Sequence, residues 1–204
     1  MKYFVTAIGT DSGKTIVSAI LCEALEVDYW KPIQAGLPKD IDVVKSLVSN
    51  KITVFHQGTF VLSQPASPHM AARIDGIEIK VDELQIPITE RDLIIEGAGG
   101  LMVPINDSEF MIDLVKSWSV SVVLVCDLYL GSINHSLLTI DKLKAENIHV
   151  QGIIFNGESN PDSEKVILNY SGWQCLLRIN KEKKITRKLV AEYAIKLKSN
   201  WNNE

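Results

Sequence analysis

The sequence is poor in cysteine and shows no cysteine pattern. Its 204 residues contain three cysteines, Cys22, Cys126 and Cys175, which lie far apart and inside apolar stretches. An odd, widely spaced set excludes a disulfide framework and the paired spacing that holds zinc. We therefore expect reduced, buried thiols in a cytoplasmic protein.

The chain also lacks runs of charge of one sign and long apolar runs. It has 21 Lys and Arg residues against 25 Asp and Glu residues, which gives a net charge of -4. Surfaces that bind nucleic acid need clustered positive charge, so we expect no nucleic-acid partner. The apolar start, MKYFVTAI, is too short for a signal-peptide core or a membrane span. We expect no membrane partner either.

No internal repeat, low-complexity tract or long linker divides the chain. With 46% apolar residues, a chain of this length can bury one core. We expect a single domain over residues 1–204.

Strand-like and helix-like segments alternate along the sequence. Short β-branched runs, typical of buried parallel strands, cover residues 3–8, 92–97, 120–127, 150–156 and 173–179. Segments with helical spacing lie at 15–26, 40–49, 110–118, 133–146, 162–170 and 185–199. This alternation predicts an α/β fold, a doubly wound and mostly parallel sheet flanked by helices.

The segment between residues 52 and 90 carries weaker signals. A short strand is expected to end near residues 29–31, and one more strand and a short helix are expected within 52–90. Ser67 followed by Pro68 suits an N-cap and the first helical position, which predicts a helix from Pro68 towards Arg73.

A glycine-rich loop, GTDSGKT at residues 9–15, follows the first predicted strand and opens the first predicted helix. Such a loop aims backbone N–H groups at phosphate oxygens, as in P-loop NTPases. Lys14 would reach the β- and γ-phosphates, and the Thr15 hydroxyl would bind Mg²⁺. Only three residues separate Gly9 from Gly13, so this loop offers fewer amides than the usual GxxxxGK[ST] spacing. The alternative is a glycine turn before an amphipathic helix, with Lys14 exposed.

Four further motifs follow the loop. They are KPIQAG at residues 31–36, SPH at 67–69, EGAGG at 96–100 and LGSINH at 130–135. In this order and at these intervals, the motifs resemble those of the dethiobiotin synthetase family. The resemblance covers residues 3 to about 156, and it depends on the motifs occurring together.

The resemblance implies an enzyme that uses ATP and Mg²⁺ to close a ureido ring. In that reaction 7,8-diaminononanoate and CO₂ give dethiobiotin, ADP and phosphate in biotin biosynthesis. A carbamate formed from the diamine attacks the γ-phosphate, so the site must hold two anions within bonding reach. Lys14 and Lys31, the latter at the carboxyl end of a predicted strand, are the expected catalytic cations. The alternative for Lys31 is a solvated lysine before a proline turn.

The resemblance also implies which residues bind the ligands. The residues expected at ATP and Mg²⁺ are Ser12, Gly13, Lys14, Thr15, Ile16, Asp42, Glu96, Gly97, Ala98, Gly99 and Asn156. Of these, Thr15, Asp42 and Glu96 are expected at the metal, and the Asn156 amide is expected to read the adenine edge. Local alternatives stay open, because Asp42 also suits a helix N-cap, Glu96 a strand end before a glycine turn, and Asn156 a strand-to-helix turn.

For the diamine, the resemblance implies a site shared between two subunits. The expected substrate-binding residues are Ala35, Gly131, Ser132, Ile133 and Asn134. Residues 131–134 precede a predicted helix, so their N–H groups can bind the distant carboxylate of the substrate. By resemblance they come from the partner subunit, which implies a homodimer.

Two positions depart from the family pattern. Ala35 stands where serine or threonine is usual, which removes one hydroxyl contact with the diamine. Residues 176–180, LLRIN, lack the glycine and proline of a late LGxIP-like element, which leaves the edge of the adenine pocket and the preference for ATP open.

Two other P-loop classes are alternatives. An amidoligase needs a glutaminase domain with a nucleophilic cysteine, and the chain has no segment left for one. A partitioning or Min-type ATPase, an ATP-dependent dimeric binding module, carries an additional lysine near the start of its loop, and none stands between Ile8 and Gly13. The apolar stripe of Ile185, Leu189, Tyr193 and Leu197 fits a helix packed on the sheet better than a membrane-surface helix.

Overall fold

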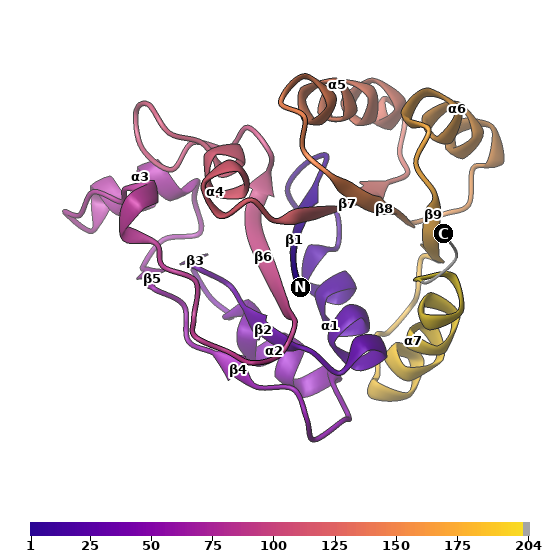
Figure 1. Ribbon diagram of the computed structural model, residues 1–204, viewed down its shortest axis with the longest axis horizontal. Helices are drawn as coiled ribbons and strands as arrows, with labels where there is room; N and C mark the ends of the chain where they lie inside the picture. The colour runs from indigo at the N-terminus through magenta and orange to yellow at the C-terminus, as the bar shows by residue number, and fades with distance from the viewer. Residues whose placement is uncertain (202–204) are drawn as a thin grey trace.

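A seven-stranded parallel sheet forms the centre of the molecule. Figure 1 shows the computed structural model, which describes residues 1–201. The strand order is β4-β2-β6-β1-β7-β8-β9, and every neighbouring pair is parallel. These strands are β1 (Lys2–Ala7), β2 (Asp28–Trp30), β4 (Phe55–His56), β6 (Leu93–Gly100), β7 (Ser121–Asp127), β8 (Val150–Asn156) and β9 (Cys175–Ile179). A separate two-stranded sheet pairs β3 (Ile33–Ala35) with β5 (Phe60–Leu62).

Helices cover both faces of the central sheet (Figure 1). One face carries α1 (Lys14–Leu25), α2 (Asp40–Leu47) and α7 (Arg187–Trp201). The other face carries α4 (Met111–Trp118), α5 (Ser132–Ala145) and α6 (Pro161–Ser171), together with α3 (Pro68–Ile74) and the short 3₁₀ helix η1 (Val81–Glu83). This arrangement confirms the predicted doubly wound α/β fold.

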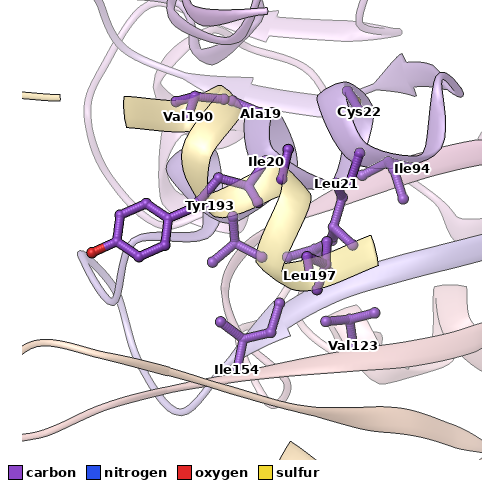
Figure 2. Close-up of a cluster of buried hydrophobic side chains, with 14 of the residues drawn as sticks. Ala19, Ile20, Leu21, Cys22, Ile94, Val123, Ile154, Val190, Tyr193 and Leu197 are labelled. Carbon is purple, nitrogen blue, oxygen red and sulfur yellow. The ribbon is translucent and has the colours of Figure 1, made fainter. Parts of the chain in front are cut away.

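The core on the α1 face joins the last helix to the middle of the sheet (Figure 2). Tyr193 and Leu197 of α7 are buried in one cluster with Ile94 of β6, Val123 of β7 and Ile154 of β8. Burying an aliphatic side chain of this size contributes about 1.5–3 kcal/mol. The apolar stripe of α7 therefore packs on the sheet as expected. Among residues 1–201, no helix combines the length and hydropathy needed to cross a membrane.

The predicted elements outside residues 52–90 all form, with ends that shift by at most three residues. The segment 52–90 is richer than predicted, because it holds two short strands, β4 and β5, in addition to α3 and η1. Strand β3 within the KPIQAG motif was not predicted at all. Ser67 does occupy the N-cap of α3 and Pro68 its first turn, but the Ser67 side chain makes no capping hydrogen bond.

The parallel arrangement brings the carboxyl ends of all seven strands to one edge of the sheet. The loop from β1 to α1, the segment after β2, and the end of β6 meet there, because β2, β6 and β1 are adjacent in the sheet. This edge is where open α/β sheets bind ligands.

Candidate active site

The phosphate loop is a tight connection between β1 and α1. Helix α1 begins at Lys14, and its N-cap, Gly13, has φ 91°. A Cβ atom at Gly13 would collide with the side-chain amide of Asn156 at the end of β8. The amide nitrogen of Asn156 donates to the backbone oxygen of Ser12 over 3.0 Å. Only glycine fits at position 13, and Asn156 fastens the loop to the neighbouring strand end.

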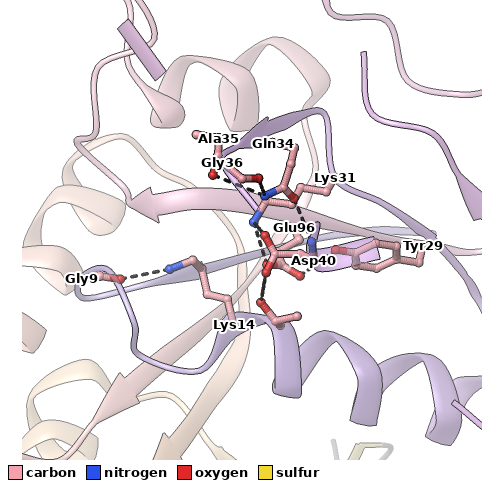
Figure 3. Close-up of polar contacts among 10 residues, drawn as sticks. Gly9, Lys14, Tyr29, Lys31, Gln34, Ala35, Gly36, Asp40 and Glu96 are labelled. Carbon is pink, nitrogen blue, oxygen red and sulfur yellow. Dashed lines mark hydrogen bonds and ion pairs between the residues drawn. The ribbon is translucent and has the colours of Figure 1, made fainter. Parts of the chain in front are cut away.

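Lys14 folds back over the loop. Its ammonium donates to the backbone oxygen of Gly9 over 3.1 Å (Figure 3). Burial, and next the nearby positive charge of Lys31, lower the pKa of Lys14 to about 8. Lys14 is 7% exposed, so the alternative of an exposed lysine after a plain glycine turn is wrong. A buried ammonium at a helix N-terminus is ready to receive an anion.

A second lysine lies between two carboxylates at the same edge (Figure 3). The ammonium of Lys31 is 2.7 Å from Asp40 Oδ2 and 2.9 Å from Glu96 Oε1. The hydroxyl of Thr15 lies 2.6 Å from Asp40 Oδ1 and 3.0 Å from Glu96 Oε1. Lys31 is buried, which rules out the solvated-lysine alternative.

The charges around Lys31 and Asp40 favour the ionised state of both groups. Burial by itself would lower the pKa of Lys31, but the charges of Glu96 and Asp40 outweigh it and raise that pKa. Burial likewise opposes ionisation of Asp40, but the charge and hydrogen bond of Lys31, with the hydrogen bond from Thr15, lower its pKa. With Lys14, the cluster contains two cations and two anions.

Asp40, and not Asp42, is the aspartate of the cluster. Both residues belong to the first turn of α2, but Asp42 is exposed, whereas Asp40 accepts a hydrogen bond from the Thr15 hydroxyl. The backbone N–H of Asp40 donates to the side-chain oxygen of Gln34 over 2.9 Å, which fixes the start of α2 against the KPIQAG segment. The structure thus places Asp40, rather than the predicted Asp42, beside Thr15 and Lys31, and the metal role of Asp42 stays a prediction.

Glu96 sits on a strand that continues past it. Its side chain is fully buried, and β6 extends to Gly100, so the glycine-turn alternative for residues 97–100 is wrong. Besides Thr15 and Lys31, the carboxylate accepts a hydrogen bond of 2.9 Å from the hydroxyl of Tyr29. Burial, followed by the charge of Glu96, raises the pKa of Tyr29 well above its usual value, which keeps the phenol protonated.

These residues line one cavity of about 650 Å³, a volume typical of small-molecule sites. Its walls include most of the predicted nucleotide and catalytic residues, namely Gly13, Lys14, Thr15, Ile16, Lys31, Glu96, Ala98 and Gly99. They also include Ala35, which was predicted to bind the diamine, together with Gln34, Asp40 and the turn before α3. Ser12, Gly97 and Asn156 lie in the same region but not on the cavity wall.

The residues predicted to hold the far end of the diamine lie elsewhere on the chain. Residues 131–134 line a second cavity of about 750 Å³, together with Glu158, Ser159, Asn160 and Ser163 near the start of α6. The two cavities share no lining residue. Within one chain, residues 131–134 therefore line a different cavity from Lys31 and the phosphate loop.

The arrangement fits Mg²⁺ better than a metal held by protein alone. Among residues 1–201, no three His, Cys, Asp or Glu side chains are grouped as metal ligands. Magnesium in phosphate-transferring enzymes needs only one or two carboxylates and a hydroxyl, and phosphate oxygens and water complete its shell. Thr15, Asp40 and Glu96 can supply that set, because the Thr15 hydroxyl is within hydrogen-bond distance of both carboxylates.

Three members of this region were missed by the sequence analysis: Tyr29, Gln34 and Asp40. Asp40 had a usable signal, because it is the first residue of the helix that follows the KPIQAG motif. Tyr29 and Gln34 had none, because their roles depend on side-chain contacts across strands and loops.

Solved structures with a similar fold belong to other P-loop ATPases. A ParA family ATPase from Chlorobium tepidum matches with a TM-score of 0.59 and 12% identity, over 95% of this chain and 97% of that chain. MinD from Pyrococcus horikoshii, complexed with Mg-ADP, matches with a TM-score of 0.56 and 14% identity, over 98% of this chain and 93% of that chain. At such low identity these likenesses show the fold alone.

Sequence relatives are far more similar. A family model described as an AAA domain matches residues 1–188. A protein of Cytophaga hutchinsonii named ATP-dependent dethiobiotin synthetase BioD is 51% identical over 202 residues, 98% of each chain. One of the same name from Christiangramia forsetii is 49% identical over 199 residues, 97% of this chain and 96% of the relative. The resemblance of the motifs thus extends over nearly the whole sequence, and the chain belongs to the ATP-dependent dethiobiotin synthetase family of P-loop enzymes.

Proposed function

We propose that this protein uses ATP and Mg²⁺ to convert 7,8-diaminononanoate and CO₂ into dethiobiotin, ADP and phosphate. The observation that carries the proposal is the placement of Lys31. A generic P-loop ATPase needs only the lysine of its phosphate loop, here Lys14, to bind phosphate. In this protein a second buried lysine, Lys31, lines the same cavity from the end of β2. Family membership supports the same reaction.

Thr15, Asp40 and Glu96 would hold Mg²⁺. The metal, when bound, would neutralise charge on the β- and γ-phosphate oxygens. The three side chains come from the start of α1, the start of α2 and the middle of β6, so their relative positions are set by the packed fold. Asp40 replaces Asp42 in this set because of its contacts with Thr15 and Lys31.

Lys14 and Lys31 would supply the positive charge that the reaction needs. Lys14 would exchange its bond with the Gly9 oxygen for a bond with phosphate, at little cost because both acceptors lie at the same loop. Lys31 would hold the carbamate oxygen beside the γ-phosphate, which places nucleophile and phosphorus together and stabilises the charge that moves between them.

The remaining assignments complete the proposed site. Ser12, Gly13, Ile16, Gly97, Ala98 and Gly99 would surround the phosphates, and Asn156 would face the adenine while holding Ser12. Ala35, beside Gln34 on the cavity wall, would lie against the diamine. Residues 131–134 would bind the substrate carboxylate from the partner subunit of a homodimer.

Three free cysteines support a reducing compartment, and we infer a cytoplasmic location.

Diamine-dependent chemistry tests this function. The purified protein is incubated with ATP, Mg²⁺ and bicarbonate, with and without 7,8-diaminononanoate, and both phosphate release and dethiobiotin are measured. We expect phosphate release that depends on the diamine and equals dethiobiotin formation. ATP hydrolysis that ignores the diamine would instead indicate a binding-module ATPase.

A further inference from the structure

Tyr29 is a buried polar side chain that the proposed reaction does not use. Its ring lies in the core between β2 and α1, and its side chain is completely buried. Only its hydroxyl reaches the active site, where it donates to Glu96 Oε2 over 2.9 Å (Figure 3). A phenylalanine would fill the same apolar space, so the hydroxyl itself calls for an explanation.

The strand register explains why a tyrosine can reach this carboxylate. Tyr29 pairs with Ile94 across the β2–β6 ladder. Side chains two residues apart on a strand share a face, so Glu96 lies on the Tyr29 side of the sheet, one step nearer the carboxyl edge. A phenol side chain is long enough to reach from Tyr29 on β2 to Glu96 on β6. Lys31, two residues after Tyr29, also contacts Glu96.

The two oxygens of Glu96 have different partners. Oε1 faces the site and contacts the Thr15 hydroxyl and the Lys31 ammonium. Oε2 faces the core and contacts Tyr29. Thr15 and Lys31, the partners of Oε1, are residues of the proposed ligand site, whereas Tyr29, the partner of Oε2, is a core residue of β2. One hydrogen bond from the sheet therefore fixes the rotation of the carboxylate while the contacts of Oε1 are exchanged.

We propose that Tyr29 is a positioning residue that holds the carboxylate plane of Glu96 so that Oε1 faces the Mg²⁺ position. The inference rests on the proposed metal role of Glu96. Without the Tyr29 hydroxyl, the Glu96 carboxylate can rotate about its terminal bond. Metal binding must then restore its orientation, which weakens the metal affinity.

The test is the affinity for Mn²⁺, a spectroscopic substitute for Mg²⁺, measured by electron paramagnetic resonance in the presence of ADP. We expect Tyr29→Phe to weaken Mn²⁺ binding about tenfold, the effect of one hydrogen bond to a charged group. The affinity for ADP in the absence of metal should stay the same, because the phosphate loop is untouched. Near-ultraviolet circular dichroism checks that the core remains packed.

A matched control is available on the other side of β6. Tyr3 of β1 also pairs with Ile94 and is also buried, but its hydroxyl contacts Met1 Sδ at 3.1 Å, away from the site. Tyr3→Phe should leave Mn²⁺ binding unchanged. An equal loss in both variants would show a general effect of core tyrosines and overturn the inference.

A double variant separates this inference from the metal role of Glu96. Glu96→Gln alone should weaken Mn²⁺ binding, and if it does not, the proposed metal site is wrong. Where Glu96→Gln does weaken binding, Tyr29→Phe added to it should cause no further loss, because the orientation of a charged ligand no longer matters. Additive losses, or an unaltered Mn²⁺ affinity in Tyr29→Phe alone, would overturn the positioning role. Tyr29→Phe alone leaves the buried Glu96 carboxylate without one hydrogen-bond donor, and the double variant removes that charge.

Discussion

At the scale of single residues, the site is organised around Lys31. Its ammonium occupies the space between the partly buried Asp40 and the fully buried Glu96, so it pairs with both carboxylates before any ligand arrives. A buried charge that loses its partner is costly, about 3–5 kcal/mol in other proteins. The lysine is thus part of the folded site as well as a group poised for the substrate.

Lys31→Gln should separate binding from chemistry. We expect turnover to fall at least about 100-fold, because the variant loses charge stabilisation at the reacting atoms. ADP affinity should change little, since the nucleotide is held mainly by the phosphate loop. Calorimetry with ADP and a dethiobiotin assay on the same preparation check this, with Lys45→Gln on the exposed side of α2 as the control. Parallel losses in affinity and turnover would make Lys31 a nucleotide-binding residue.

The two aspartates at the start of α2 offer a direct comparison. Asp40→Asn should lower turnover on the order of 100-fold at limiting Mg²⁺, because a carboxylate beside Thr15 is lost. Asp42→Asn should stay within about twofold of the unaltered protein, since Asp42 is exposed. Phosphate release across a Mg²⁺ titration measures both. The reverse outcome would restore Asp42 as the metal ligand and reject the assignment of Asp40.

At the scale of elements, the sequence predicted the long strands and helices well and the short ones poorly. Strands such as β7 and β8 are near-continuous apolar runs, which are typical of a sheet covered on both faces, so their pattern shows in the sequence. Strands β3, β4 and β5 have two or three residues each, too few for any period to show. They form because neighbouring backbone pairs with them, which is a tertiary effect.

The same distinction holds for the site. The phosphate loop and the lysine of KPIQAG were found because motif and strand end coincide in the sequence. The choice between Asp40 and Asp42 was missed because it depends on the rotation of α2 about its axis. Gln34 fixes that rotation by accepting from the Asp40 N–H, and nothing in the linear pattern shows this bond.

Asp28 fastens the edge strand β4 to the main sheet. Its side chain accepts hydrogen bonds from the Val54 N–H and the Thr89 hydroxyl and lies 3.2 Å from His56 Nε2. Burial opposes ionisation, but these hydrogen bonds outweigh it and lower the pKa of Asp28 below its usual value of 3.8. A carboxylate whose folded pKa is lowered stabilises the protein above the unfolded pKa and loses that contribution as pH falls through the folded pKa.

Asp28→Asn should therefore change the acid side of the stability profile. At pH 7 the variant should be less stable, and below about pH 5 its free energy of unfolding should fall less steeply than that of the unaltered protein. Urea unfolding between pH 3 and pH 7 measures this, with the exposed Asp162→Asn as the control. If the stability of Asp28→Asn and of the unaltered protein changed in parallel with pH, Asp28 would titrate alike in the folded and unfolded states.

At the scale of the whole molecule, the two halves of the proposed substrate site lie in different cavities of one chain. In the loop before α5, Leu130 precedes the N-cap Gly131 and is 103% exposed. A second subunit would cover it and complete the site.

Leu130→Glu tests the homodimer. We expect the variant to sediment as a monomer and to bind the diamine at least about tenfold more weakly, because a charge would be buried at the interface. ADP binding should persist, since the phosphate loop belongs to one chain. Ile195→Glu, at a residue of α7 that is 73% exposed, is the control and should change neither property. A Leu130→Glu protein that remains dimeric would place the interface elsewhere.

The central position of β1 sets the order in which the protein can fold during synthesis. The first strand made lies between β6 and β7, so its two neighbours end at residues 100 and 127. At roughly 5–20 residues per second, the ribosome needs several seconds to produce them. During that time β1 and the phosphate loop behind it have no sheet to join. The phosphate loop at residues 9–15 therefore joins the completed centre of the sheet only after residue 127 has been translated.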